Sequence, residues 1–392
     1  MSFPSGSVSF RRFTVTGQHP KSIEQSHLDG LTEFTLKESE YTPEEIEYGW
    51  SGGRHIFDSK FSFEHNVFAD ALHFALRIDT NRVPSAHKRA YQIIEEENTA
   101  ATNPSGHISK LQKREVKDVV RRKIDEDLRS GRFRRSKLVP ILWDFPGHTL
   151  YSSASSSDCE KLFEIFERTF SLTLDPLSTG SIAQRYFEKH HKKRDYEDLR
   201  PTRFVPGPEG ENQHPEYPWC LKGPQPKDFL GNEFLLWLWH HIETRGGTIK
   251  TDEANDVAIV IDRSLELDCA YGQTGKDSLR GDGPTRMPEA RDALRSGKLP
   301  RRAGFLLENG GHQFQFTLAA ESLALSSAIL PDVEEAEDAR VLFEERIGML
   351  RDLSQSLDAL FHTFLKLRTT SWESQVTAIR NWIQKASKHA AA

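Results

Sequence analysis

The stretch from Lys110 to Lys137 reads KLQKREVKDVVRRKIDEDLRSGRFRRSK, and it places a strongly basic segment inside a chain that is acidic as a whole. The segment holds twelve Lys and Arg residues against five Asp and Glu residues, a local balance of +7, whereas the full chain of 392 residues carries a formal net charge of −6. A polyanionic partner would therefore have to be met by a segregated basic patch and not by bulk charge.

The first part of this stretch has the period of an amphipathic helix. At about 100° per residue, cations fall on one side of the helix and apolar residues on the other. The cations are Lys110, Arg114, Lys117 and Arg121, and the apolar residues are Ile108, Leu111, Val116 and Val119, while Lys113 adds a further cation to the same helix. The pattern predicts a helix with a cationic outer face, and an ordinary solvated surface helix is the alternative explanation for that face.

The second part of the stretch begins with the turn pair Ser130-Gly131 and continues with Arg132, Phe133, Arg134 and Arg135. Arginines fork onto phosphate oxygens, while an aromatic ring meets a groove or a base, so this set suits a finger laid along a DNA backbone. We expect a basic helical finger over residues 82–137 with Phe133 at its tip. Burial of Phe133 against the parent domain is the alternative.

Length and composition describe a folded protein of two or three compact units, with 36% apolar residues, 24 Phe and 7 Trp. Cys159, Cys220 and Cys269 are odd in number and lack CxxC spacing, so neither a disulfide framework nor a zinc cage is indicated. The chain shows no apolar run of signal-peptide length and no stretch of about 18 apolar residues. We expect a cytoplasmic protein with reduced thiols, no cofactor and no membrane partner.

Alternating strand-like and helix-like segments predict an α+β fold with mixed or antiparallel sheets, flanking helices and C-terminal helices. The expected units are a central domain (1–81 and 138–180), the finger (82–137), a second α+β domain (181–330) and C-terminal helices (331–392). Within the segment of about 190–227, the proline- and glycine-rich stretch 200–227 is predicted to be a domain boundary or a long surface excursion.

Several local predictions concern the first half of the chain. The alternation from Val8 to Val15 slips in phase at Arg11-Arg12, which indicates a bulged strand. Gly49-Trp50 is interpreted as a turn, and Ile56-Phe57 and Phe61-Phe63 as strands. Leu138 to Trp143 predicts a strand whose Pro140 makes it an edge strand or places a bulge in it.

Further predictions concern the second half. Phe229 to Arg245 is apolar on nearly all sides and predicts a buried helix. Asn309-Gly310 predicts a hairpin turn between two strands, and the apolar stripe of Ala339 to Leu367 predicts a long helix that docks on a surface. Lys276 and Arg280 lie in a loop that adds a second basic site.

Taken in order, these segments resemble the recombination-associated RdgC family over nearly the full chain. The resemblance rests on the N-terminal strand with Phe10 and Phe13, on Gly49-Trp50, and on the basic helix that leads to Phe133. It extends through the Trp143-Asp144 strand end, SSSDCEKLFEIFERTFSLTLDPL and MPEARDALRSGKLPRRAGFLLENGGHQFQFTL. No one of these motifs is diagnostic, but the ordered set is.

The resemblance implies a ring-shaped homodimer that encloses double-stranded DNA without sequence preference and antagonises a RecA-type recombinase at the nucleoid. The basic helix would match the family's finger, and Phe133 an aromatic at its tip. Two departures are visible. The segment 190–219 resembles an insertion, and Arg280-Gly281-Asp282 stands where shorter members carry a basic-polar pair, which puts the lower-domain contact in doubt.

Two other classes of function compete with DNA binding. His190-His191 and His240-His241, with nearby acids, suggest a metal-dependent nuclease, but adjacent histidines point to different sides of a helix, and no HExxH or phosphate-loop motif occurs. A scaffold that acts through its C-terminal helices without touching DNA is the other alternative. We expect no catalytic residues and no metal site.

Overall fold

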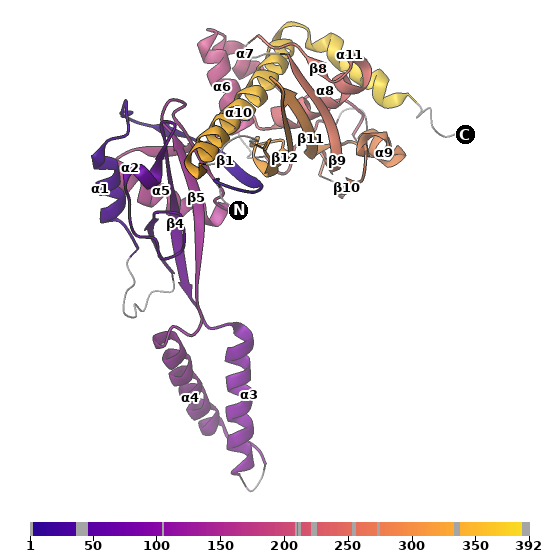
Figure 1. Ribbon diagram of the computed structural model, residues 1–392. Coiled ribbons are helices and arrows are strands. Elements are labelled where there is room, and N and C mark those ends of the chain that lie inside the picture. Colours follow the sequence, from indigo (N-terminus) through magenta and orange to yellow (C-terminus); the bar gives the residue numbers. More distant parts are fainter. Residues whose placement is uncertain are drawn as a thin grey trace.

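The computed structural model describes residues 3–36, 46–103, 106–207, 210, 213–220, 226–252, 256–272, 275–332 and 338–385. The fold is α+β, as predicted: thirteen strands form one antiparallel sheet flanked by helices (Figure 1). The strands run in the order β10-β9-β11-β12-β13-β1-β6-β5-β4-β2, with β3, β7 and β8 paired to β4, β1 and β9.

The strands are β1 (Val8–Thr16), β2 (Ile46–Ser51), β3 (Val67–Phe68), β4 (Ala71–Asn81), β5 (Arg134–Asp144), β6 (Thr149–Ser152), β7 (Thr173–Pro176), β8 (Thr248–Ile249), β9 (Val257–Cys269), β10 (Asp277–Arg280), β11 (Lys298–Asn309), β12 (His312–Ala319) and β13 (Leu325–Ile329). The helices are α1 (Gln25–Glu33), α2 (Phe63–Asn66), α3 (Ser85–Ala101), α4 (Lys110–Arg129), α5 (Ser156–Phe170), α6 (Thr179–Lys189), α7 (Lys193–Asp198), α8 (Phe229–Arg245), the 3-10 turn η1 (Pro284–Arg286), α9 (Pro288–Arg295), α10 (Ala339–Thr370) and α11 (Trp372–Gln384).

Strand β1 joins two half-sheets. Its first residues pair with β13 and its later residues with β6. The first half-sheet consists of β1, β6, β5, β4 and β2, the second half-sheet consists of β10, β9, β11, β12 and β13, and β1 makes the two continuous. The predicted phase slip is present at Arg12, which is buried directly before buried Phe13. The slip has a physical cause: Phe10 belongs to the core of the second half, whereas Phe13 belongs to the core of the first half.

Strand β5 is an interior strand over Ile141–Asp144, where it pairs with both β4 and β6, so the prediction of an edge strand is wrong for that part. Pro140 lies where β6 ends. Its carbonyl still accepts from Ser153 N and Ser152 Oγ, and its missing N–H faces the place where the β6 ladder has run out. On the N-terminal side of Pro140, from Arg134 to Val139, β5 pairs with β4 alone.

Two other predictions in the first half are wrong. Gly49 and Trp50 lie inside β2, and Gly49 is needed because a Cβ there would approach the backbone nitrogen of Leu36 to 2.5 Å. Residues 56–62 form turns and coil, followed by helix α2, in place of the two expected strands. The buried polar residues Asp58 and Asn66 hold this segment through hydrogen bonds, which the apolar pattern does not report.

The second half packs around α8, whose residues from Phe229 to His240 are all buried, as the sequence predicted. The 200–227 stretch is not a surface excursion: Phe204, Val205 and Tyr217 in its described part belong to the same core. The predicted hairpin β11–β12 and the helices α10 and α11 are also confirmed. No helix within the described residues is long and apolar enough to cross a membrane.

Helix α10 spans the junction between the two halves (Figure 1). Its C-terminal half places Phe361 and Phe364 against Phe234 of α8, with ring centroids 5.3 and 5.7 Å apart. Charged side chains along α10 tie it to the first half and to the N-terminal segment: Arg340 to the carbonyls of Glu64 and Val67, Arg346 to those of Phe3 and Gly6, Arg351 to Asp144, and Asp358 to Arg12.

Helices α3 and α4 form a hairpin that projects from β4 and β5 into solvent (Figure 1), and we call this hairpin the finger. The second half extends to the side of the finger, so the molecule has the outline of an L. The inner corner of the L is bounded by the finger on one arm and by the edge near β10 on the other.

Candidate nucleic-acid interface

The basic helix α4 begins where the sequence provides a capping box. Ser109 Oγ accepts from Gln112 N at 3.3 Å, and the side chain of Gln112 accepts from Ser109 N at 2.9 Å, so two of the helix's first N–H donors are satisfied. Val116 and Val120 are buried against α3, which itself has no buried residue. Their burial turns the opposite side of α4 outward.

The predicted cationic strip lies on that outward side. Lys110, Lys113, Arg114, Lys117 and Arg121 are all exposed. Within the described part of the chain none of these five forms an ion pair, whereas Lys123 on the inner side pairs with Glu95 of α3. The five side chains therefore remain available to an external anion.

The predicted apolar side of α4 is only partly correct. Val116 is 3% exposed, but Leu111 is 66% exposed, because it lies five positions before Val116 and therefore about 140° around the helix from it. Ile93 and Ile94 on α3 are also open, at 45% and 48%. They lie midway along α3, whereas Leu111 lies at the start of α4 near the free end, so the three do not form one patch, and we call them the apolar finger residues. A hairpin of two helices lacks the second layer that would cover such side chains.

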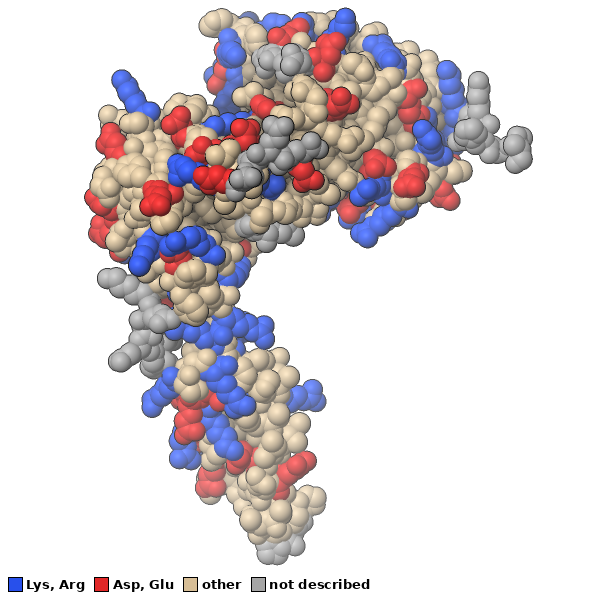
Figure 2. Space-filling view, viewed as in Figure 1, with Lys and Arg blue, Asp and Glu red and all other residues tan. Residues whose placement is uncertain are grey.

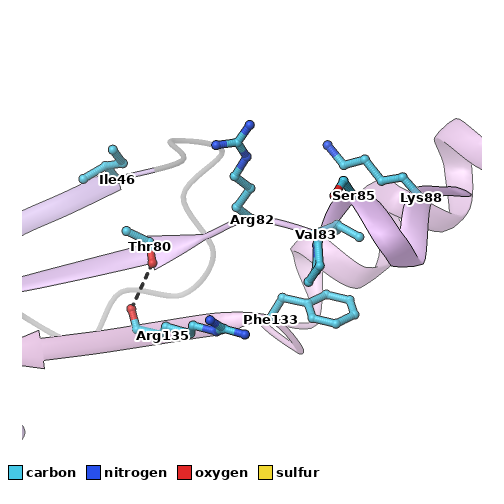
Figure 3. Close-up of a pocket in the computed structure, with 9 residues that line it drawn as sticks. Ile46, Thr80, Arg82, Val83, Ser85, Lys88, Phe133 and Arg135 are labelled. Carbon is cyan, nitrogen blue, oxygen red and sulfur yellow. Dashed lines mark hydrogen bonds between the residues drawn. The ribbon is translucent and has the colours of Figure 1, made fainter. Parts of the chain in front are cut away.

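The expectation that Phe133 marks the tip of the finger is wrong. The free end of the finger lies between α3 and α4, and Phe133 lies at the opposite end, where α4 returns to β5 (Figures 1 and 3). Its half-buried ring contacts the imidazole of His87 with centroids 4.8 Å apart and lies 5.5 Å from the guanidinium carbon of Arg132. The turn at Ser130-Gly131, which in the sequence resembles the end of the finger, is the place where the chain returns to the sheet.

Arg134 is engaged within the protein, which does not suit the DNA contact predicted for it. Its guanidinium lies 2.9 Å from Asp79 and 3.3 Å from Glu47, and Asp79 is also bound by Arg77 at 2.7 Å. Burial alone would raise the pKa of Asp79, but the hydrogen bonds from Arg77, Ser136 and Arg134 outweigh it and lower that pKa. Arg134 thus closes a cross-strand ion cluster.

The other cations at the root of the finger are less constrained. Arg132 makes a long contact of 3.4 Å with Asp127 and is 63% exposed, and Arg135 is exposed on β5. Arg82 and Lys88, which the sequence prediction missed, are also exposed here. They flank Pro84, where strand β4 ends and α3 begins, and that strand-to-helix change was the signal that could have found them. Figure 2 shows Lys and Arg side chains gathered where the finger meets the sheet.

The second predicted basic site lies on the other arm of the L. Arg280 is exposed on the edge strand β10, whereas Lys276 pairs with Glu266 at 2.6 Å. Strand β10 lies at the edge of the second half that borders the inner corner of the L (Figure 1). The structure therefore does not bring Lys276 and Arg280 to the finger, but it places them across the inner corner from it.

The histidines of the nuclease alternative have structural neighbours. His190 packs on Tyr186 with centroids 4.5 Å apart, and His240 packs edge-on against Trp382 at 5.3 Å. Burial lowers the pKa of His240 to about 4. Among the described residues, no group of three His, Cys, Asp or Glu side chains is placed to hold a metal ion.

A comparison with protein-family models gives no match to this chain, and a comparison with curated proteins gives none either. Function is therefore inferred from the residues and their placement.

Proposed function

We propose that the protein binds double-stranded DNA without sequence preference, as a ring-shaped homodimer, and thereby antagonises a RecA-type recombinase, as the resemblance to the RdgC family implies. It acts without catalysis, cofactor or metal, at the nucleoid. One observation carries the proposal: a projecting hairpin presents five exposed cations that have no ion-pair partner within the described residues. The five like charges repel one another, which destabilises the folded protein, and a polyanion bound along the strip would offset this repulsion.

The placement of the remaining cations supports duplex as the polyanion. Arg82, Lys88 and Arg135 add exposed cations at the root of the finger, and Arg280 is exposed on β10 in the other arm of the L. Cations on two arms suit a rod-like ligand that contacts both arms, and contacts through Lys and Arg to phosphates carry no base information. Binding is therefore insensitive to sequence.

A dimer follows from the small number of contacts that one finger offers. Two copies engaged on one DNA molecule raise the overall affinity without any new kind of contact, and a two-fold axis repeats each basic group on the opposite wall. The apolar finger residues provide contacts for a mate's finger, because Ile93, Ile94 and Leu111 lose unfavourable exposure if two hairpins pack into a four-helix arrangement. Contacts at both arms would close the ring.

The test is a mobility-shift titration with Lys117→Ala plus Arg121→Ala on two duplexes of unrelated sequence. Affinity should fall by the same factor on both, and the slope of log K against log salt should become less steep by about 0.9 for each phosphate that a removed cation had neutralised. Lys21→Ala plus Lys60→Ala, at exposed lysines outside the finger, is the matched control and should leave the slope unchanged. Equal binding by the finger variant and the unchanged protein would remove the finger from the interface.

Antagonism of a recombinase is tested on the same variant. The unchanged protein should inhibit DNA strand exchange by a RecA-type recombinase, and added duplex should relieve the inhibition, since the two proteins compete for DNA. The finger double variant should inhibit less in proportion to its loss of affinity. Inhibition that survives the loss of DNA binding would instead favour the scaffold function.

A further inference from the structure

A cavity of about 600 Å³ lies at the root of the finger, between the start of β2, the end of β4, the start of α3 and the start of β5 (Figure 3). We call it the root pocket. Its volume falls within the roughly 300–1,000 Å³ of pockets that hold small ligands. The residues that define it are Ile46, Val83 and Phe133 on its apolar side and Arg82, Lys88 and Arg135 on its charged side.

The apolar side of the root pocket combines a fixed part and an open part. Val83 is 2% exposed and anchors the wall, whereas Ile46 is 44% exposed and has no cover within the described residues. Phe133 is half-buried, and its orientation is fixed by the edge contact with His87 and by the guanidinium of Arg132. An aromatic ring held in this way offers a planar ligand a surface at little entropic cost.

The charged side is not neutralised. Arg82, Lys88 and Arg135 are exposed, and no ion pair is formed by any of them among the described residues, although their neighbour Arg134 is paired twice. Figure 3 shows the charged ends of Arg82 and Lys88 on one side of the strand, facing each other across a gap, and Arg135 extending along β5 toward Phe133. Helix α3 begins here and directs the positive end of its dipole toward the pocket. Its N-cap residue, Pro84, makes no side-chain cap hydrogen bond.

We propose that the root pocket holds one unpaired nucleotide of DNA, with its base on Phe133 and its phosphates on Arg82, Lys88 and Arg135. The inference rests on the proposed function and adds a substrate class to it: duplex that contains a single-stranded gap. Phosphate alone would leave the apolar side unused, and an apolar side chain alone would leave three cations unpaired. A nucleotide satisfies both sides, in the way that aromatic platforms within basic grooves bind single strands.

The experiment compares two closed-circular DNA molecules of the same length, a continuous duplex and the same duplex with a short gap in one strand, whose missing phosphates alone would weaken binding slightly. The gapped molecule should bind roughly tenfold more tightly, the order of one base stacked on an aromatic ring. A fluorescent purine analogue placed in the gap should be quenched on binding. Phe133→Leu, which keeps an apolar side chain but removes the ring, should abolish both the preference and the quenching.

Two further variants separate binding from folding. Arg82→Ala changes an exposed side chain, so it should lower the preference for the gapped molecule without lowering the melting temperature. Phe57→Leu is the matched aromatic control, because Phe57 is 64% exposed on the same half of the molecule but outside the pocket. It should leave the preference intact.

The outcomes distinguish this inference from the proposed function. Strong binding that is equal for the two DNA molecules would overturn the root pocket as a nucleotide site and leave duplex binding untouched. Binding to the gapped molecule alone would support the pocket and overturn the duplex-enclosing function. If Phe133→Leu and Arg82→Ala change only the monomer–dimer equilibrium, the pocket is a protein contact and the inference is wrong.

Discussion

His73 of β4 shows how a single buried side chain ties stability to pH. Its ring packs edge-on against Phe343 and Phe3, at 5.1 and 6.3 Å between centroids, and burial lowers its pKa to about 4. The unfolded chain binds a proton at this imidazole near pH 6.5, whereas the folded chain does not until about pH 4. Stability is therefore complete above about pH 6.5 and falls as the pH drops toward 4.

The measurement is chemical denaturation at neutral and mildly acidic pH. His73→Phe keeps an aromatic ring and removes the titrating group, so its free energy of unfolding should decline less on acidification, by roughly 3 kcal/mol at most. His55→Gln, at an exposed imidazole, serves as the control. A decline in the His73 variant equal to that of the unchanged protein would contradict the assignment.

At the scale of elements, α10 connects the two halves. Its charged residues Arg351 and Asp358 bind Asp144 and Arg12 of the first half, and its Phe361 packs on α8 of the second half. In the Arg12–Asp358 pair, Arg12 is 5% and Asp358 32% exposed, with contacts of 2.8 and 2.7 Å. Neutralising Asp358 removes the carboxylate that both nitrogens of the Arg12 guanidinium contact.

Asp358→Asn should therefore destabilise the protein by roughly 2 kcal/mol, less than the 3–5 kcal/mol typical of a fully buried pair because Asp358 is partly solvated. Asp352→Asn, at a carboxylate on the same helix that is 54% exposed, is the control and should cost little. Urea denaturation gives both values. Equal effects of the two substitutions would show that the tie contributes no more than a surface charge.

The sequence predicts the elements whose signal is local and misses those whose signal is tertiary. The all-round apolar pattern of Phe229 to Arg245 could only be a buried helix, and Asn309-Gly310 could only join two strands. Gly49 resembles a turn residue because a close approach by Leu36 requires the same residue type as a turn does. Helix α3 runs from Ser85 to Ala101 and has no buried residue, so no apolar face in the sequence marks where it begins and ends.

The candidate site divides in the same way. The exposed strip of α4 follows from helical period alone, so the sequence predicts it correctly as a face. Arg134 and Phe133 are wrongly assigned to the tip of the finger. The sequence alone does not show whether the turn at Ser130-Gly131 lies at the free end of the finger or at the place where the chain returns to the sheet. Arg82 and Lys88 are missed because they join Arg135 only through the pairing of β4 with β5.

At the scale of the whole molecule, the proposed ring predicts that the protein distinguishes DNA by topology. Leu111→Cys would place an exposed thiol near the free end of the finger, where two copies would meet in the proposed ring. The natural thiols interfere little, since burial raises the pKa of Cys159 and, to about 12, that of Cys220. After loading and oxidation, the protein should resist high salt on closed circles and slide from linear duplex with free ends.

Equal release of the oxidised protein from both forms of DNA would exclude a closed ring and leave an open clamp. Reduction before the salt challenge is the internal control, because it should restore release from circles. Leu111→Ser at the same position tests whether the apolar side chain of Leu111 helps to hold the two copies together. It should shift the population toward monomer in sedimentation.

The crossing of β1 between the two half-sheets also governs the order in which the chain acquires structure during synthesis. Arg11 to Thr14 can pair with β6 once residue 152 has left the ribosome, but Val8 and Phe10 must wait for β13 at residues 325–329. At about 5–20 residues per second the delay is on the order of ten seconds or more. Throughout it, the nascent first half presents an apolar strand end without its partner, which makes this segment the place where a chaperone would be needed and where misassembly between neighbouring chains would begin.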